Sequence, residues 1–333
     1  MKRREVLAAG AAAVVAPALP LWAQTQAIGA GQRSRVQRFL GMLDGRQRSQ
    51  ATFAYDSRQR RAWNYMLGSR RAPGLALEQM TPEQKEAALD VLASGLSPLG
   101  FEKALNIMLQ QDILRDEWGK GAADRNRERF SLMVFGEPSL TQPWGWRWEG
   151  HHLTLSFTLR GEVVVGWTPS AFASEPNIVT SGPHSGLMVL QEEEVLGRAL
   201  YTDLSGQNRA RALVNPRSPA NILTVAGREQ RYAGDDRGAF VGDMTTTQAD
   251  LVARLMEVYA VEWLPAPLAD IQAARLAANT PETMRFVWAG ADLEGDSIYY
   301  RFHNEPVIVE FSNVRNQPLH LHTVFHDFGR GLG

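Results

Sequence analysis

The clearest pattern in the chain is a strict alternation of apolar and polar residues between Leu153 and Leu159. Its apolar positions are Leu153, Leu155, Phe157 and Leu159, and its polar positions are Thr154, Ser156 and Thr158. A period of two predicts a half-buried β-strand. The Trp-rich stretch that starts at Trp144 leads into this strand through His151 and His152. We therefore expect the rest of the sheet to be organised around residues 144–159.

The histidine pair lies at the start of the predicted strand. If the pleat extends back through the pair, His151 lies on the face of the leucines and His152 on the face of the threonines, because neighbouring side chains point in opposite directions. His152 is then the candidate for a polar site. A bulge at Gly150 would reverse this choice, so His151 stays an alternative.

Helical spacing dominates the first part of the chain. Apolar residues recur every three or four positions from Val36, and the sequence Thr81-Pro82-Glu83-Gln84 predicts a helix start with a capping box. A second box is expected at Thr245, and helix is also expected within residues 187–211. Prolines and glycines between Pro169 and Gly186 predict a long irregular connection.

Strand patterns dominate the second part of the chain. They are expected at residues 162–167, 284–290, 297–303, 306–313 and 319–324. The prediction is an α+β fold, with a single domain in which an antiparallel β-sheet is flanked by α-helices. Residues 33–130 form its helical first part, and residues 131–333 form a mixed, β-rich part.

Composition indicates an ordinary globular protein. The 333 residues are 44% hydrophobic and 21% charged, with a formal net charge of -1. A nearly neutral chain without a run of basic residues argues against nucleic acid as a partner. The chain has no cysteine, so any metal must be bound by histidine or carboxylate side chains. Such ligands favour zinc, iron, copper or manganese.

The N-terminus is typical of an export signal. Residues 1–23 contain the pair Arg3-Arg4 and then an alanine-rich apolar segment, which resembles a twin-arginine signal peptide. Cleavage is expected after Ala23, with Ala27 as the alternative, and residues 24–32 are expected to be a short flexible segment. The twin-arginine export machinery is then a partner, the location is periplasmic or secreted, and the mature protein has no membrane span.

The histidines provide the candidate chemistry. All seven lie in the β-rich part of the chain, at positions 151, 152, 184, 303, 320, 322 and 326. In a strand, His320 and His322 point to the same side, which suits two ligands of one metal ion. A third ligand is expected from His151 or His152, and Glu149 and Asp327 are candidates for a further ligand or a general base.

Other chemistries have less support in the sequence. The alternative for the histidines is a structural role in a polar corner of the core, with hydrogen bonds to neighbouring groups. The three tryptophans of residues 144–148 are expected in the core. The sequence has no G-x-S-x-G elbow and no glycine-rich phosphate loop. Hydrolase triads and nucleotide binding are therefore not favoured.

Several stretches resemble a bacterial and fungal family known as domain of unknown function 3500. They are F-A-Y-D-S-R-Q-R-R-A-W from Phe53, T-P-E-Q-K from Thr81, W-G-W-R-W-E-G-H-H-L-T-L from Trp144, T-P-S-A-F from Thr168 and H-L-H-T-V-F from His320. The resemblance covers nearly the whole mature chain. It implies one domain across both halves and two histidine clusters that are features of the family.

Two functions agree with these patterns. The first is an exported metal-dependent enzyme acting on a small molecule, with an open coordination position for water or substrate. The second is a non-catalytic periplasmic protein that binds a metal or a small ligand. An open three-ligand site with a carboxylate near the bound water favours the enzyme, whereas a closed four-ligand site favours the binding protein.

Overall fold

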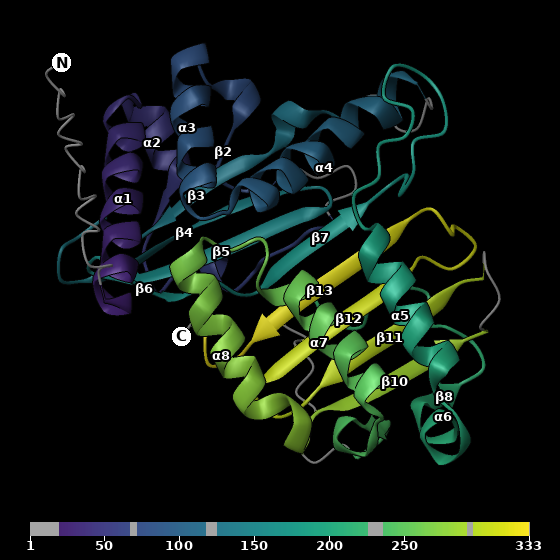
Figure 1. Cartoon of the computed structure of the whole chain (residues 1–333). Helices are drawn as coiled ribbons and strands as arrows, with labels where there is room; N and C mark the ends of the chain where they lie inside the picture. Colours follow the sequence, from purple (N-terminus) through teal and green to yellow (C-terminus); the bar gives the residue numbers. More distant parts are fainter. Residues whose placement is uncertain (1–19, 67–71, 118–124, 226–235, 292–295, 333) are drawn as a thin grey trace, which may run out of the picture.

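The computed structural model describes residues 20–66, 72–117, 125–225, 236–291 and 296–332. Within these ranges the chain forms α-helices and one large β-sheet (Figure 1). The α-helices are α1 (Leu21–Gly41), α2 (Gly45–Ala51), α3 (Pro82–Ser94), α4 (Pro98–Asp116), α5 (Gln191–Asp203), α6 (Gly206–Ala212), α7 (Thr246–Ala260) and α8 (Ala266–Thr283).

The described strands all belong to a single 13-stranded sheet. They are β1 (Thr52–Phe53), β2 (Leu75–Ala76), β3 (Ser131–Phe135), β4 (Pro143–Gly150), β5 (Leu153–Arg160), β6 (Val163–Gly166), β7 (Ser170–Ser174), β8 (Leu213–Asn215), β9 (Ala239–Phe240), β10 (Arg285–Gly290), β11 (Ile298–His303), β12 (Val307–Asn313) and β13 (Leu321–Asp327).

The sheet joins the two halves of the chain. Its main path runs β1-β3-β4-β5-β7-β13-β12-β11-β10-β8, while β2, β6 and β9 pair with β3, β5 and β10. Only the short outer pairs β1–β3 and β8–β10 are parallel among the described pairings. The predicted α+β fold with a largely antiparallel sheet is therefore confirmed.

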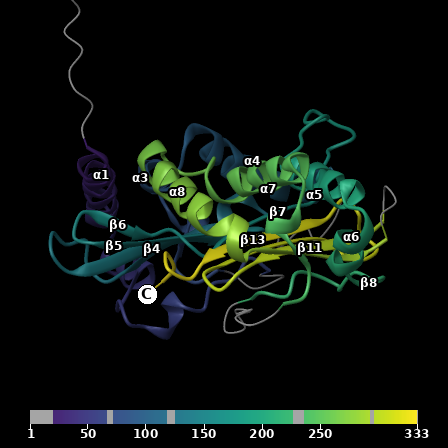
Figure 2. The ribbon, with the colours of Figure 1, turned by 60° about the horizontal axis from the view of Figure 1, so that its bottom comes forward.

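Helices cover one face of this sheet (Figure 2). The apolar side chains of the alternating pattern point to this face: the ring of Trp146 stacks on Phe157 with centroids 4.4 Å apart, and Phe157 meets the edge of Trp263 after α7. Tyr300 of β11 likewise contacts Tyr259 of α7. The tryptophans of β4 are fully buried here, as core residues.

Polar side chains occupy the opposite face, which we call the loop-covered face. Arg147 and Glu149 lie on it in β4, and register places Ser312 and Glu310 of β12 on it beside His322 and Val324 of β13. Arg147 donates to the carbonyl of Arg60 at 3.0 Å. Irregular segments, including residues 59–66 and 216–224, cover this face in place of α-helices.

Most helices and strands predicted from local sequence patterns are present in the structure. The capping box at Thr81 starts α3, the box at Thr245 starts α7, and β5 spans the alternating stretch. Residues 162–167 contain β6, which pairs with β5 as a hairpin.

Two expectations were wrong. Residues 24–32 are not a flexible segment, because they belong to α1, where Thr25 and Gln32 are buried and Gly29 packs on the backbone of Glu162. The region after Pro169 is not irregular throughout, since it contains β7, which pairs with β5 and β13. Its small residues pack in the centre of the sheet despite the prolines that flank them.

Residues 1–19, which include the arginine pair of the expected signal peptide, lie outside the described residues, and α1 begins at Leu21. Ala27, the alternative cleavage position, is within α1. In the described part of the chain, no helix combines the length and the apolar character that a membrane crossing requires.

Candidate metal centre

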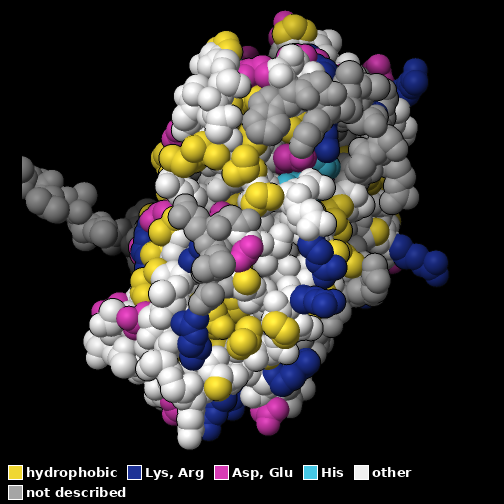
Figure 3. All heavy atoms as spheres, turned by 90° about the vertical axis from the view of Figure 1, so that its right-hand side faces the viewer, with side chains coloured by type: hydrophobic (Ala, Val, Ile, Leu, Met, Phe, Trp, Pro, Cys, Tyr) yellow, Lys and Arg dark blue, Asp and Glu magenta, His cyan; other side chains and the backbone are white. Residues whose placement is uncertain are grey.

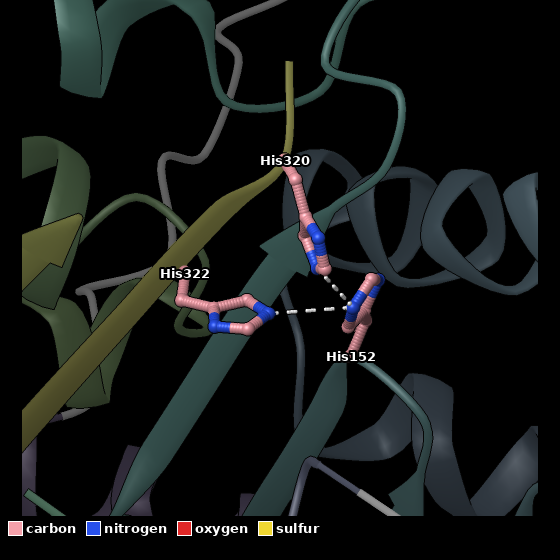
Figure 4. Close-up of side chains that lie close together, drawn as sticks. All are labelled: His152, His320 and His322. Carbon is pink, nitrogen blue, oxygen red and sulfur yellow. Dashed lines mark hydrogen bonds between the residues drawn. The ribbon is translucent and has the colours of Figure 1, made fainter. Parts of the chain in front are cut away.

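Three histidines from two distant parts of the chain converge on the loop-covered face (Figure 4). Nε2 of His152 lies 3.0 Å from Nε2 of His320 and 3.4 Å from Nε2 of His322. Across the described ranges, this trio is the group of three or more potential metal ligands whose donor atoms lie within 4.8 Å of one another. We call these residues the histidine trio.

A hairpin turn positions His152. β4 ends at Gly150, β5 begins at Leu153, and these two residues pair directly, so His151 and His152 are the two turn residues. His152 has a φ of 74°, which is uncommon for a residue other than glycine. Its N–H donates to the carbonyl of Tyr65 at 2.7 Å, and its carbonyl accepts the N–H of Ala173 at 2.8 Å. These bonds hold the turn.

His152 faces the other two histidines as expected, but not because of strand parity. The pleat does not extend through the pair, and Gly150 and Leu153 pair in register, without the bulge that was considered at Gly150. Left-handed backbone geometry at His152, fixed by the neighbouring segments, is what turns its imidazole toward His320 and His322.

The other two histidines come from the start of β13. His320 precedes the strand and His322 lies within it, and their side chains point to the same side as expected. Nδ1 of His320 lies 2.9 Å from Oε1 of Gln317, and Nδ1 of His322 lies 2.6 Å from Oδ1 of Asn221.

These amide partners fix which ring nitrogen of His322 carries the proton. Oδ1 of Asn221 also accepts the N–H of Ile222 at 2.8 Å, so this amide atom is an acceptor. Nδ1 of His322 must then donate, which leaves a lone pair on Nε2 of the neutral ring. The contact with Oε1 of Gln317 likewise favours the proton on Nδ1 of His320 and leaves a lone pair on its Nε2. Partners that hold imidazoles in this orientation are typical around protein metal ions.

Burial favours the uncharged form of His152 and His322. Burial lowers the pKa of His152 well below its usual value, and the neighbouring His151 and the other two members of the trio lower it further. Burial also lowers the pKa of His322, with His320 adding to the effect. Neutral imidazoles are the form that binds a metal ion.

The spacing of the trio suits a tetrahedral metal. Bonds of about 2.05 Å at tetrahedral angles place ligand nitrogens about 3.3 Å apart, close to the 3.0 and 3.4 Å separations at His152. His152 and His322 are 0% and 3% exposed, whereas the side chain of His320 is 14% exposed. A fourth position is therefore reached from the His320 side.

His151 stands behind the trio rather than in it. Its ring stacks on that of His152 with centroids 3.6 Å apart, and its Nδ1 contacts Oε1 of Gln111 at 2.9 Å. Arg125 also contacts the His151 ring and lies 3.6 Å from Glu175. Oε2 of Glu175 is 3.8 Å from Nδ1 of His320.

The structure does not bring the two predicted carboxylates into the trio. Glu149 is buried, and its Oε2 lies 2.8 Å from Nε of Arg147 in an ion pair and accepts the N–H of Asn64 at 2.9 Å. Asp327 binds Arg275 at 3.0 Å at the far end of β13. It is five residues beyond His322 along the strand, which amounts to about 17 Å. Both carboxylates have structural partners.

Sequence reasoning missed Asn221, Gln317, Tyr65 and Glu175. Tyr65 contacts His322 edge-on, with centroids 5.2 Å apart. Gln317 is three residues before His320, a spacing that a turn brings together, so its role had a local signal. The other three come from irregular segments whose sequences carry no periodicity.

Residues 26–330 match the family described as Protein of unknown function (DUF3500). The chain belongs to this family. The match spans nearly the whole sequence, including both halves of the sheet and all three histidines of the trio. No curated protein and no solved structure matches the chain.

The buried Glu149 predicts a measurable pH dependence of stability. Burial raises the pKa of this carboxyl from 4.5 to about 7, although Arg147 and the N–H of Asn64 oppose the shift. The folded state then binds the proton of Glu149 more tightly than the unfolded state. This proton therefore contributes to the stability of the folded state fully below about pH 4.5, and its contribution is lost as the pH rises through about 7.

Urea unfolding of the wild type and of Glu149→Gln at pH 5, 6, 7 and 8 checks this expectation. The free energy of unfolding of the wild type should fall relative to the variant by up to about 3 kcal/mol over this range. A difference that stays constant or grows with pH would contradict the raised pKa.

Proposed function

We propose that the histidine trio binds one divalent transition metal, with zinc as the first choice, and that the protein is a metal-dependent enzyme acting on a small molecule. The observation that carries the proposal is the convergence of three Nε2 atoms, with separations at His152 close to those of a tetrahedral metal site. The Gln317 and Asn221 contacts place the protons of His320 and His322 on Nδ1, so that Nε2 of each has a lone pair for the ion. Iron, copper and manganese are the other ions that nitrogen ligands accept.

The number of ligands favours an enzyme over a storage or transport protein. Structural zinc sites have four protein ligands, whereas catalytic sites have three and keep one position for water or substrate. In the described residues the trio has no fourth ligand within its reach. A metal held there would lower the pKa of a bound water to about 7 and so supply a nucleophile at neutral pH.

The chain's own groups around the open side have supporting roles. The side chain of Glu175 is 6% exposed and lies 3.8 Å from Nδ1 of His320, beside Gln317. A carboxylate at this place favours a proton on Nδ1 of His320, which leaves Nε2 free for a metal. Arg125, next to Glu175 and His151, provides a positive charge at the rim of the site.

Metal analysis of the purified protein tests the proposal. The wild type should contain about one equivalent of metal, and His320→Ala with His322→Ala should contain none, because one imidazole cannot retain the ion. The exposed His184 provides the matched control, and His184→Ala should keep the full equivalent. Inductively coupled plasma mass spectrometry gives the stoichiometry and the identity of the metal.

Cobalt substitution then separates the two functions. In the cobalt protein, azide should change the visible absorption if the fourth position is open. A spectrum that azide leaves unchanged would favour the non-catalytic binding protein, and a wild type without metal, even after incubation with zinc, would overturn the proposal.

Asn221 should tune the affinity for the metal. Asn221→Leu removes the acceptor for Nδ1 of His322, and loss of such a partner weakens metal binding by about 10 to 100-fold. Asn221→Asp keeps the acceptor for both His322 and the N–H of Ile222, so it should restore most of the affinity. Competition with a chromophoric zinc chelator measures both. Equal affinities of the wild type and Asn221→Leu would remove Asn221 from the site.

We also propose export by the twin-arginine machinery to the periplasm or the outside of the cell. Support comes from the pair Arg3-Arg4 and the alanine-rich segment that follows it. This route passes folded proteins, which suits a protein that acquires its metal before export.

Replacing both arginines by lysine tests the export route. Arg3→Lys with Arg4→Lys should keep the precursor in the cytoplasm, because the paired guanidinium groups are the feature that the signal resembles. Cell fractionation and the mass of the N-terminus provide the measurement. Normal recovery of the double variant outside the cytoplasm would contradict the assignment.

A further inference from the structure

A second site lies on the face of the sheet that helices cover, between α7 and α8, which lie side by side in Figure 1. It is a cavity of about 750 Å³, within the size range of small-molecule sites. The short helix η4 (Val241–Asp243), which precedes α7, also lines it. We call this cavity the helix groove.

The floor of the helix groove is apolar and buried. Its side chains are at most 5% exposed, and they are Val241, Val252, Met256 and Leu276. The half-buried Met244 lines the groove beside them. Methionine side chains are flexible and polarizable, so they adapt to the shape of an apolar ligand. This floor suits a hydrocarbon chain.

Alanines form the walls of the groove. They are Ala249 and Ala253 on α7 and Ala273 and Ala277 on α8. Three of the four are exposed, and Ala249 is half-buried. A methyl group is too short to fill the space between the two helices, so the apolar floor below the alanines stays accessible from solvent.

Charged side chains of α7 follow one rim of the groove. Asp250, Arg254 and Glu257 line it, and their spacing of four and three residues places them on one side of the helix. Arg254 donates to Oε2 of Glu257 at 2.9 Å and to Oε1 of Glu192 at 2.8 Å, and it also pairs with Glu262. One guanidinium group is thus shared among three carboxylates.

Asp250 adds a further negative charge to this rim. Its side chain is exposed and has no hydrogen bond or ion pair with any residue that the structure describes. Together with the cluster around Arg254, the rim has four carboxylates and one guanidinium group. A positive charge at the rim would therefore be attracted, and a negative charge repelled.

We propose that the helix groove binds an organic cation with an apolar chain, with the chain on the buried floor and an ammonium group at the rim beside Asp250. Binding sites for small molecules combine a mainly apolar lining with a few polar groups that orient the ligand. Here the floor contributes the apolar contact, and the carboxylates of α7 select the sign of the charge.

The helix groove is separate from the histidine trio. The trio lies on the loop-covered face and the groove on the opposite face, so the sheet lies between them. Figure 3 shows histidine atoms that reach the surface in the upper part of the view, beside acidic side chains. Binding in the groove therefore does not depend on the metal.

Calorimetric titration of the full-length protein tests the proposal with four probes: octyltrimethylammonium, octanoate, octanol and tetramethylammonium. Octyltrimethylammonium should bind most tightly, because it alone combines the chain with the positive charge. Its affinity should exceed that of octanoate by about threefold or more, as expected for charges at an exposed rim. Tetramethylammonium, which has no chain, should bind most weakly.

Two neighbouring alanines of α8 provide matched variants that locate the binding. Ala273 lines the groove and Ala274 does not, and both are exposed, so both variants should fold. Ala273→Phe should weaken octyltrimethylammonium by about tenfold or more, because the phenyl ring takes the place of the chain. Ala274→Phe should leave the affinity unchanged.

Asp250→Asn tests the charge without filling the groove. It should weaken octyltrimethylammonium by about two- to threefold and leave octanol unchanged. Asp56→Asn, which removes an exposed carboxylate from the first part of the chain, should change neither affinity.

The affinity should also persist in the His320→Ala, His322→Ala protein, which separates this proposal from the metal centre. Absence of octyltrimethylammonium binding at millimolar concentration, equal or tighter binding of octanoate, equal effects of the two phenylalanine variants or loss of binding with the histidines would each overturn it. So would a dimer in sedimentation velocity that Ala273→Phe converts to a monomer, because a second copy of the chain would then occupy the groove.

Discussion

Two buried carboxylates hold the covering segments on the helix-free face of the sheet, and the histidine trio depends on both. Glu149 accepts the N–H of Asn64, and Glu310 accepts the N–H groups of Leu223 and Thr224. A buried carboxylate is costly unless hydrogen bonds satisfy it, and backbone N–H groups in irregular segments have the same need. Each carboxylate therefore satisfies N–H groups of a covering segment, and these N–H groups lower the cost of burying the carboxylate.

These attachments place the groups that position the imidazoles. The segment held by Glu149 carries the Tyr65 carbonyl that binds His152, and the segment held by Glu310 carries the Asn221 amide that binds His322. The two segments also meet, since Nδ2 of Asn221 lies 3.2 Å from the sulfur of Met66. The histidine trio thus lies where these two segments, each held by a buried carboxylate, contact each other over the middle of the sheet.

The period of two explains how one sheet serves both stability and chemistry. Alternate residues of β4 and β5 direct aromatic rings toward the helices and polar groups toward the loops. In β7, Ala171 and Ala173 point to the loop side, where Trp63 and Tyr65 pack on them. Small side chains at these positions leave room for the Tyr65 ring beside His322.

This division also shows what the sequence could predict. The alternating strand, both capping boxes and the same-side placement of His320 and His322 depend on local spacing, so they were predictable. The bond from His152 to Tyr65 and the partners in segments 59–66 and 216–224 depend on contacts between residues about 85 or more apart. The place of β7 depends on its pairing with β5 and with the distant β13. Local periodicity does not contain such contacts.

The protonation of His152 links these contacts to the proposed metal chemistry. Asn221 and Gln317 commit His322 and His320 to lone pairs on Nε2, so without a metal His152 must carry its proton on Nε2 and donate it to His320 at 3.0 Å. The three imidazoles are then linked through Nε2 of His152, while Nδ1 of His152 has no hydrogen-bond partner among the described residues.

Metal binding requires that His152 alone change its tautomer. The proton must move to Nδ1, which among the described residues has no hydrogen-bond partner. A buried N–H left unsatisfied costs about 1 to 3 kcal/mol, so His152 is the weakest of the three ligands. His320 and His322 already have the tautomer that binds the ion, so the cost of changing the tautomer of His152 limits the affinity of the site for the metal.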